Sequence, residues 1–248
     1  MGRRGLAEME REPRVPILLY HKVGRPPRGA RVPGQYVSPG LFRKHLDYLA
    51  KRGYASLSLL DLVAKDRPLP PRPIVITFDD GYRCLYQEAF PLLAEAGFTA
   101  TVFLVAGALG ASNLWEQAVG DVAEQMLDLP EVREMRAGGI EFGSHTLSHA
   151  HLTGLPEEEA RREIADSRAR LAEALGEPCR AFAYPYGERN ARVKDLVAEA
   201  GYEAACTTVR AWASREDDPL ALPRINIRRY NVLPRFAQKL RQAERARP

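Results

Sequence analysis

The sequence predicts an α/β fold built around a mostly parallel β-sheet. Short apolar runs rich in β-branched residues alternate along the chain with longer segments of helical periodicity. Several of these longer segments are followed by glycine, which is common at helix C-termini: Gly53, Gly97, Gly176 and Gly201. Strands that alternate with helices form βαβ units, in which neighbouring strands run parallel.

Seven segments have the length and composition of buried strands. They combine β-branched, aromatic and small residues in runs too short for a core helix. In chain order they are Ile17–Tyr20, Ile74–Phe78, Ala100–Val105, Ile140–Gly143, Arg180–Ala183, Glu203–Thr207 and Arg224–Ile227. Five longer segments with apolar residues three or four positions apart predict amphipathic helices. These are Pro39–Arg52, Leu85–Ala96, Pro156–Leu175, Ala191–Ala200 and Leu233–Ala246.

Composition and charge are those of an ordinary globular protein. Of the 248 residues, 45% are hydrophobic and 27% are charged, and 36 Lys and Arg outnumber 32 Asp and Glu by four. The length suits one domain, which we place at residues 14–248, after a polar N-terminal tail at residues 1–13. The basic residues are spread along the chain, so nucleic acid is not an expected partner, whereas contact with an anionic glycan is compatible with the charge.

The sequence carries no sign of a membrane segment or a disulfide framework. No stretch has the length of a membrane helix, and the residues from Met1 to Arg14 lack the apolar core of a signal peptide. The three cysteines are scattered, as expected for thiols that fill a reduced core. We therefore expect a cytoplasmic protein, or an extracytoplasmic one if an export signal has been removed.

One predicted strand ends in residues that a buried strand does not normally carry. Ile74–Phe78 is followed directly by Asp79, Asp80 and Gly81. Carboxylates beside an apolar core are costly to desolvate, so a metal ion or an arginine usually compensates them. A plain Asp-Gly turn after a strand is the simpler interpretation, and this segment alone does not decide between the two.

A second cluster favours a metal site. His145 and His149 follow the predicted strand Ile140–Gly143 and stand four residues apart, and the chain has only five histidines. On a helical turn this spacing puts both imidazoles on one face, where they can bind one transition-metal ion. With Asp80 they predict a site of two histidines and one carboxylate with an open position, as catalytic zinc requires. Asp79 is then free to act as a base.

Three segments resemble motifs of a known family, the polysaccharide deacetylases, which form the NodB-homology domain of carbohydrate esterase family four. Thr77–Gly81 resembles the first motif, Ser144–His149 the second, and Arg180–Gly187 the arginine and Pro-Tyr motif that walls the active site. The resemblance extends from about Val15 to about Leu240, with the motifs in the family's order. It implies a distorted, incomplete (β/α) barrel of about seven parallel strands.

The resemblance also implies roles for individual residues. Asp79 would take a proton from the attacking water, and Arg180 would orient that carboxylate. The backbone N–H of Tyr186 would contact the oxyanion that develops at the acetyl carbonyl. Tyr184 and Tyr186 would form the wall of the substrate groove, and Leu222 would line the acetate pocket. The simpler interpretations are a surface position for Arg180 and ordinary packing for the two tyrosines.

The general acid departs from the usual family pattern. Many members carry a late Leu-x-His motif, but here this region reads Leu222-Pro223-Arg224, and an arginine cannot donate a proton at neutral pH. Tyr20-His21 resembles the Tyr-His pair of the poly-N-acetylglucosamine deacetylase branch. His21 is therefore the predicted proton donor, with a packing role as the alternative.

These observations predict a metal-dependent hydrolase that removes N-acetyl groups from an N-acetylglucosamine-type glycan. One divalent metal is expected, zinc by default, although cobalt, nickel or iron can bind the same ligands. Two alternatives stay open: an amide hydrolase of the same superfamily with a small or lipid-linked substrate, and an inert carbohydrate-binding relative. A phosphoryl-transfer enzyme would leave the histidine pair unexplained, and the chain has no Gly-rich phosphate loop.

Overall fold

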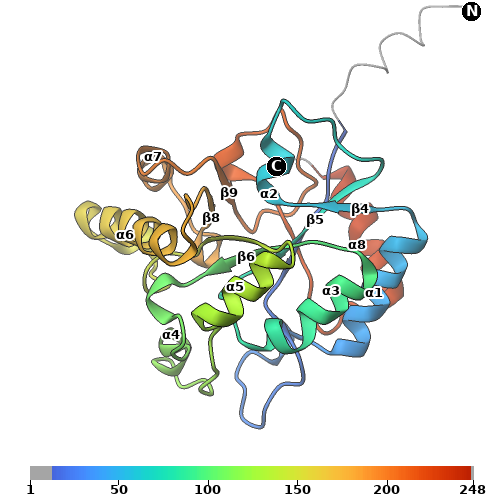
Figure 1. Cartoon of the computed structure of the whole chain (residues 1–248), viewed down its shortest axis with the longest axis horizontal. Coiled ribbons are helices and arrows are strands. Elements are labelled where there is room, and N and C mark those ends of the chain that lie inside the picture. Colours follow the sequence, from blue (N-terminus) through green and yellow to red (C-terminus); the bar gives the residue numbers. More distant parts are fainter. Residues whose placement is uncertain (1–12, 247–248) are drawn as a thin grey trace, which may run out of the picture.

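Eight of the ten described strands form one curled sheet that helices surround (Figure 1), and the other two pair in a separate small sheet. The structure is a computed structural model that describes residues 13–246. Each of the seven predicted strands is present, with bounds within two residues of those expected. The strands are β1 Ile17–Tyr20, β2 Lys22–Val23, β3 Tyr36–Val37, β4 Ala55–Leu57, β5 Pro73–Phe78, β6 Thr101–Leu104, β7 Glu141–Ser144, β8 Ala181–Ala183, β9 Ala204–Cys206 and β10 Ile225–Asn226.

The predicted helices are also present, and three short ones were not expected. The helices are α1 Pro39–Lys51, α2 Leu59–Val63, α3 Phe90–Ala96, α4 Leu114–Gln117, α5 Leu129–Ala137, α6 Glu157–Leu175, α7 Ala191–Glu199 and α8 Leu233–Arg245. The predicted helix over 85–96 begins with a π-helical turn at Leu85–Ala89 and continues as α3. The three that the sequence analysis missed, α2, α4 and α5, have four to nine residues, too few for a clear periodicity.

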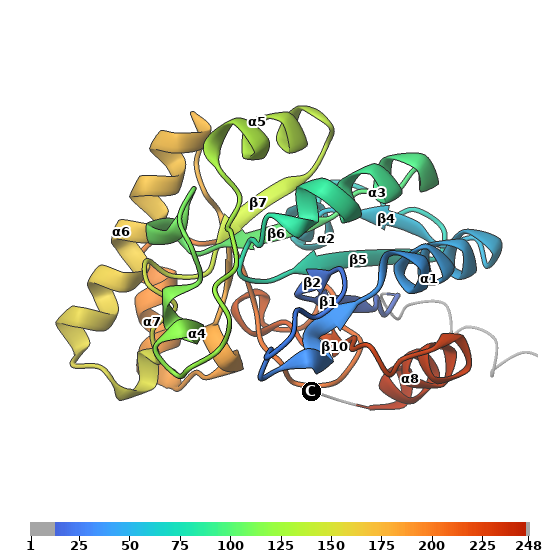
Figure 2. The same ribbon diagram turned by 90° about the horizontal axis from the view of Figure 1, so that it is seen from below.

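The sheet confirms the predicted distorted barrel. Its strand order is β10-β1-β5-β6-β7-β8-β9, and every neighbouring pair is parallel. The short β4 pairs with the first half of β5, while β6 pairs with its last two residues. Most of the helices lie around the outside of the strands (Figure 2), whereas Leu59 and Leu62 of α2 pack on the inside of the curl. Because all the strands point the same way, their carboxyl ends meet at one edge, where a parallel barrel carries its site.

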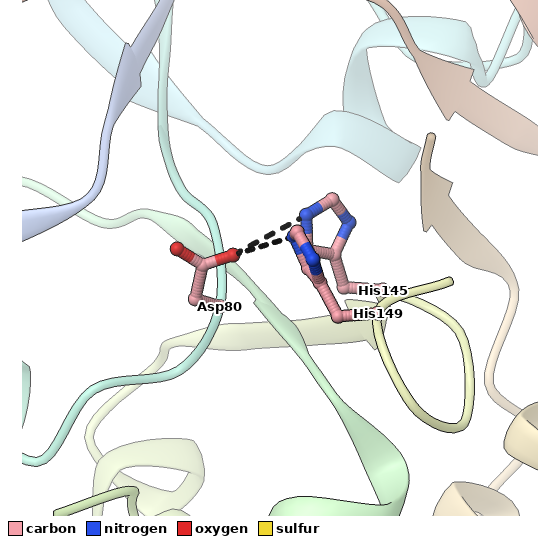
Figure 3. A group of neighbouring side chains, drawn as sticks. All are labelled: Asp80, His145 and His149. Carbon is pink, nitrogen blue, oxygen red and sulfur yellow. Dashed lines mark ion pairs between the residues drawn. The ribbon is translucent and has the colours of Figure 1, made fainter. Parts of the chain in front are cut away.

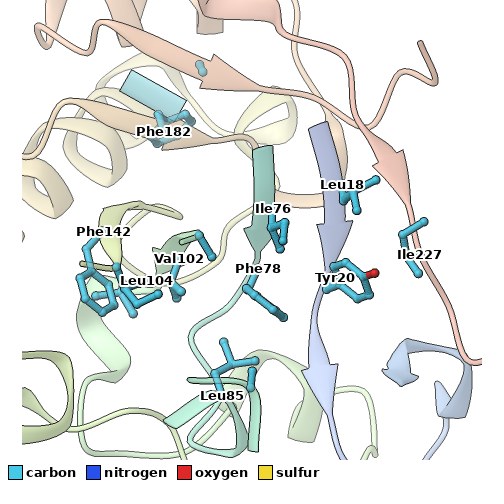
Figure 4. Close-up of a cluster of buried hydrophobic side chains, with 14 of the residues drawn as sticks. Leu18, Tyr20, Ile76, Phe78, Leu85, Val102, Leu104, Phe142, Phe182 and Ile227 are labelled. Carbon is cyan, nitrogen blue, oxygen red and sulfur yellow. The ribbon is translucent and has the colours of Figure 1, made fainter. Parts of the chain in front are cut away.

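Side chains alternate between two cores along each strand. On β5, Ile74, Ile76 and Phe78 pack outward against the helices, whereas Val75 faces the inside of the curl. Leu18 on β1 joins the outer core, part of which Figure 4 shows. All six residues of β5 are buried, as the apolar run predicted. The alternation decides which residues near a strand can reach the inside of the barrel.

Two further expectations concern the division of the chain into a tail and a domain. The predicted polar tail at residues 1–13 lies almost entirely outside the described residues, and the assignment of residues 14–248 to a single domain stays a prediction. None of the helices within residues 13–246 combines the length and the apolar character needed to cross a lipid bilayer.

Gly81 is the glycine on which the chain's course after β5 depends. It has φ +81°, and a Cβ atom added there would lie 2.6 Å from Leu104 Cδ2. We expect Gly81→Ala to lower the free energy of unfolding by roughly 2–4 kcal/mol, because it adds overpacking to left-handed strain. Gly97→Ala is the matched control, since Gly97 has φ +68° but nothing within 4 Å of the added Cβ. That variant should lose only about 1 kcal/mol. Equal losses in urea unfolding of the two variants would contradict the steric argument.

Candidate active site

The predicted acids and histidines converge at the carboxyl ends of the parallel strands. Asp79 and Asp80 follow β5 directly, and His145 follows β7. Asp80 has φ +73° and Gly81 has φ +81°, so the chain turns sharply after the strand. The β6–β7 and β5–β6 pairings bring the two strand ends close together, although Phe78 and Ser144 are 66 positions apart in the sequence.

Three buried side chains share one small space (Figure 3). Asp80 Oδ1 lies 3.4 Å from His145 Nε2 and 3.3 Å from His149 Nε2. The three candidate ligand atoms all lie within 4.8 Å of one another. This arrangement joins two imidazole nitrogens and one carboxylate oxygen, a donor set that suits zinc and related transition metals.

The hydrogen bonds around these residues leave lone pairs directed at the shared space. His145 Nδ1 lies 2.7 Å from the carbonyl oxygen of Ala183, which can only accept, so Nδ1 carries the proton and Nε2 is free to bind a metal. Among the described residues, Asp80 Oδ1 is buried without a hydrogen-bond donor. An orphaned carboxylate oxygen facing an unprotonated imidazole nitrogen is unfavourable by itself. A cation between them would satisfy both atoms, so the residues fit a metal ion.

The loop that carries the two histidines is not helical, so the prediction that a helical turn brings their rings together is wrong. Thr146 and His149 both have left-handed backbone conformations, with φ +67° and +63°. Glu163 of α6 holds the loop, because its carboxylate accepts hydrogen bonds from the backbone N–H groups of Leu147 and Ser148 at 3.0 and 2.9 Å. The rings thus meet through a strained, tethered turn rather than through helical spacing.

A buried arginine holds the second carboxylate. Arg224 donates to Asp79 through both terminal nitrogens, at 2.6 Å to Oδ1 and 2.7 Å to Oδ2, and it also contacts Thr77 Oγ1 and the carbonyl of Thr207. Burial raises the pKa of the Asp79 carboxyl, but Arg224, with smaller contributions from His145 and His21, lowers it more, and the net pKa lies below the ordinary value. Asp79 is therefore ionised at neutral pH, as a base must be.

A cavity of about 610 Å³ opens onto these groups. Asp79, Asp80 and both candidate metal-binding histidines line it, and so does the predicted acid His21. Tyr186 lines it as well and is 46% exposed, with its hydroxyl 3.2 Å from His149 Nδ1. Its backbone has φ +60°, which turns the peptide out of the helical course of the neighbouring residues. The positions of His21 and Tyr186 agree with their predicted roles, which stay predictions.

His21 lines the cavity on the side opposite the histidine loop, near Asp79 and Asp80. Burial lowers the pKa of its imidazole, while the negative charges of Asp80 and Asp79 raise it, and the net pKa lies below the ordinary value. Its Nδ1 is buried without a hydrogen-bond partner among the described residues. The packing alternative is weakened by this geometry, since a purely structural histidine would normally have both nitrogens satisfied.

Three sequence predictions for this site are wrong, two of them for the same reason. Arg180 and Tyr184 share the face of β8 that carries Phe182, which packs in the outer core. Arg180 is exposed and pairs with Glu203 at 3.2 Å, so it does not orient Asp79. Tyr184 is fully buried and donates to the carbonyl of Leu220, so it does not wall the cavity.

The third wrong prediction concerns Leu222. It faces the inside of the curl, but it packs in the inner core beside Ala183 and Cys206 and is not among the residues that line the cavity. Its backbone instead bridges to β9 through hydrogen bonds with Ala205 and Thr207, which helps to close the sheet toward β10.

The segment 107–138 covers one side of the cavity, which is lined there by Trp115, Glu116, Val119 and Asp121. Its helix α4 carries Trp115, whose ring stacks on His149 with centroids 4.9 Å apart. Lys22 anchors the segment, because its buried ammonium lies 3.0 Å from Glu116 and 2.6 Å from Glu124. Trp115 thereby adds an aromatic wall to the site and restricts the His149 ring.

Sequence reasoning missed Arg224 and Lys22 as site residues. In the sequence, Arg224 stands out only because it occupies the position where the family pattern has a histidine. The sequence did contain a sign of its role, because Arg224 is a charged residue beside an apolar strand. Its neighbour Ile225 faces the outer core, so Arg224 must face the inside of the barrel. Lys22 had a similar signal, a lysine two residues after the end of a buried strand.

Comparisons with known proteins agree with this geometry. The family model described as polysaccharide deacetylase matches residues 66–205, which is more than half of the chain. The chain belongs to the polysaccharide deacetylase family. The family inferred from the three motifs is confirmed, and with it the class of activity, metal-dependent deacetylation.

Individual relatives show how far the similarity extends. YxkH of Bacillus subtilis is 29% identical over 221 residues, which cover 88% of this chain and 73% of that protein. The poly-beta-1,6-N-acetyl-D-glucosamine N-deacetylase of Escherichia coli is 29% identical over 238 residues, covering 82% of this chain and 35% of that enzyme. The chain thus spans about a third of the E. coli enzyme. The deacetylase PplD of Streptococcus pyogenes, solved in complex with acetate, has a TM-score of 0.79 at 26% identity and covers 92% of this chain and 98% of that one.

The Arg224–Asp79 pair predicts a shift in pH dependence. In Arg224→Gln the burial of Asp79 is no longer opposed by the guanidinium, so the pKa of the carboxyl rises and its basic form requires higher pH. The acid limb of the pH profile of kcat/KM should therefore move to higher pH. Arg224→Lys keeps the charge and should shift it less. An unchanged acid limb in Arg224→Gln, with metal content intact, would show that Asp79 is not the titrating base.

Proposed function

We propose that this protein is a zinc-dependent N-deacetylase of a glycan of the N-acetylglucosamine type. The observation that carries the proposal is the buried group of Asp80, His145 and His149 with an ionised carboxylate, Asp79, beside it. The substrate class is supported by the name of the E. coli relative, which acts on poly-beta-1,6-N-acetyl-D-glucosamine. The cavity supports it as well, since its aromatic walls at Trp115 and Tyr186 suit the apolar faces of sugar rings.

Zinc is the metal that these ligands favour, and Asp80, His145 and His149 would hold it. Two imidazoles and one carboxylate leave a position open, which is the usual arrangement of catalytic zinc sites. When bound, the metal supplies an activated water and polarises the acetyl carbonyl. Cobalt, nickel and iron accept the same donors, so the metal found also depends on availability.

Asp79 serves as the base in this proposal. Its carboxylate is ionised because Arg224 lowers its pKa against the effect of burial, and the paired guanidinium also fixes its orientation. Asp79 Oδ2 lies 4.0 Å from His145 Nε2, so the carboxylate borders the candidate metal position without forming part of the cluster. It can therefore take the proton of a water that attacks the acetyl carbon.

His21 delivers a proton to the leaving amine, and Tyr186 stabilises the acetyl oxygen. His21 reaches the cavity from the end of β1, across the sheet from the histidine loop. Arg224 is occupied by Asp79 and stays charged, which leaves His21 as the group able to transfer a proton, at a pH set by its lowered pKa. Tyr186 lines the same cavity, and its backbone N–H would donate to a developing oxyanion.

Metal analysis of two variants tests the assignment of the acids and histidines. His149→Ala should lose most of its bound metal and its deacetylase activity, because one of three protein ligands is gone. Asp79→Asn is the matched control: it should keep its metal while its rate falls by orders of magnitude, because the base is gone and the ligands remain. The measurements are metal content by mass spectrometry and acetate release from N-acetylglucosamine oligomers. Full metal content in His149→Ala, or loss of metal in Asp79→Asn, would contradict the assignment.

A leaving-group experiment tests His21. His21→Ala should lower amide hydrolysis roughly 10²–10⁴-fold and flatten the alkaline limb of the pH profile, because the group whose deprotonation causes that limb is absent. An acetate ester with a good leaving group needs no proton, so its hydrolysis should be much less affected. If both substrates lose activity equally, His21 acts in binding or packing. Comparable acetate release from peptidoglycan fragments or small amides would change the proposed substrate class.

A further inference from the structure

A second hollow lies on the outer side of the barrel. It has a volume of about 640 Å³ and is lined by α1, the start of α8 and the turn before β5. It shares no lining residue with the cavity of the active site. Arg72, which lines it, precedes β5, whereas Asp79 follows β5, so these two residues lie at opposite ends of a six-residue strand, about 20 Å apart.

Positive charge collects around this groove, where four cations face a single acid. Lys44, Lys51 and Arg52 lie on one face of α1 and its C-terminal end, and Arg72 faces them. Asp47 is the only acid that lines the groove. Within residues 13–246, none of the four cations forms an ion pair, although many exposed arginines elsewhere in the fold do so. Cations at the end of α1 are favoured by the helix dipole, but that explains neither Lys44 nor Arg72.

Aromatic rings, rather than carboxylates, hold the two guanidinium groups. Arg52 Cζ lies 4.8 Å from the centroid of the Tyr48 ring, and Arg72 Cζ lies 4.9 Å from that of Tyr54. A guanidinium that stacks on a ring uses its face and keeps its N–H groups available. Both arginines are therefore restrained and still able to donate to an anion.

The backbone at Arg72 is an independent sign of function. Five described residues other than glycine have positive φ, and four of them, Asp80, Thr146, His149 and Tyr186, belong to the active site. The fifth is Arg72, with φ +48°. Such conformations are unfavourable for an arginine and concentrate at functional sites, where the strain places a side chain.

We propose that this groove binds a linear polyanion that carries phosphate or carboxylate groups. Lys44 and Lys51 are seven residues apart on a helix, which separates them by about 10 Å along its axis. A single small anion cannot contact all four cations over that distance, whereas a chain with repeated charges can. The groove is thus a second attachment point, separate from the site that removes acetyl groups.

Fluorescence anisotropy with labelled inorganic polyphosphate and labelled polyglutamate tests the proposal. The full chain should bind at least one of the two, with affinity that falls as salt rises. Binding of polyphosphate alone would identify phosphate as the recognised group, and binding of polyglutamate alone would identify carboxylate. Competition by inorganic phosphate should be weak, because one phosphate cannot span the groove. Failure of both polymers to bind at low salt would overturn the proposal.

A charge-matched pair of variants separates the groove from general basicity. Arg52→Gln combined with Arg72→Gln should weaken binding about tenfold or more. Arg162→Gln combined with Arg170→Gln removes two exposed arginines from α6 and should change binding less than twofold. Equal weakening in the two double variants would show non-specific attraction. All four substitutions lie outside the active site, so acetate release from neutral N-acetylglucosamine oligomers should not change, whether or not the polyanion binds.

Arg72→Gly tests whether the strained arginine serves binding or folding. Glycine adopts positive φ without strain, so this variant should keep or raise the melting temperature while it loses polyanion affinity. A large fall in melting temperature with unchanged affinity would show that Arg72 is structural and would overturn its part in the site.

Discussion

Two adjacent carboxylates at the end of a strand buried on both faces impose the constraint around which this structure is organised. Neither Asp79 nor Asp80 can stay ionised beside an apolar core unless an opposite charge or a set of donors meets it. Arg224 satisfies Asp79 with two short hydrogen bonds. Asp80 faces two imidazole nitrogens, and its buried Oδ1 lacks a donor among the described residues. One acid is thereby fixed as a base, and the other is left to bind a cation.

The chain maintains this arrangement through backbone conformations that are unfavourable in isolation. Asp80, Thr146 and His149 all have positive φ, and each is held by contacts that the barrel provides. Glu163 of α6 accepts two backbone N–H groups of the histidine loop, and Lys22 ties the covering segment to the end of the first strand. Strain at the site is therefore balanced by packing outside it, which is common where side chains must be preorganised.

The corrections to the sequence predictions share a physical origin. Arg180 and Tyr184 were selected by resemblance to a motif, yet both stand on the alternation of β8 that faces the outer core with Phe182. Arg224 stands on the inward alternation beside β10 and is fully buried. Side chains on a strand alternate between its two faces, so Arg224 points inward and can reach Asp79, whereas Arg180 points outward and cannot. A motif match that ignores this alternation selects Arg180, which is the wrong arginine. Leu222 faces inward but lies too deep in the inner core to line the cavity.

The sequence by itself determined the class of fold, the seven strands, the family, and the group of Asp79, Asp80, His145 and His149, because these depend on local patterns of apolar residues and on motifs a few residues long. Only the tertiary structure decided that Arg224 pairs with Asp79, that Trp115 stacks on His149, and that His21 shares their cavity. These contacts join residues from 34 to 145 positions apart, and no local pattern encodes them. They arise because parallel strands bring their carboxyl ends to one edge, whatever the distance along the chain.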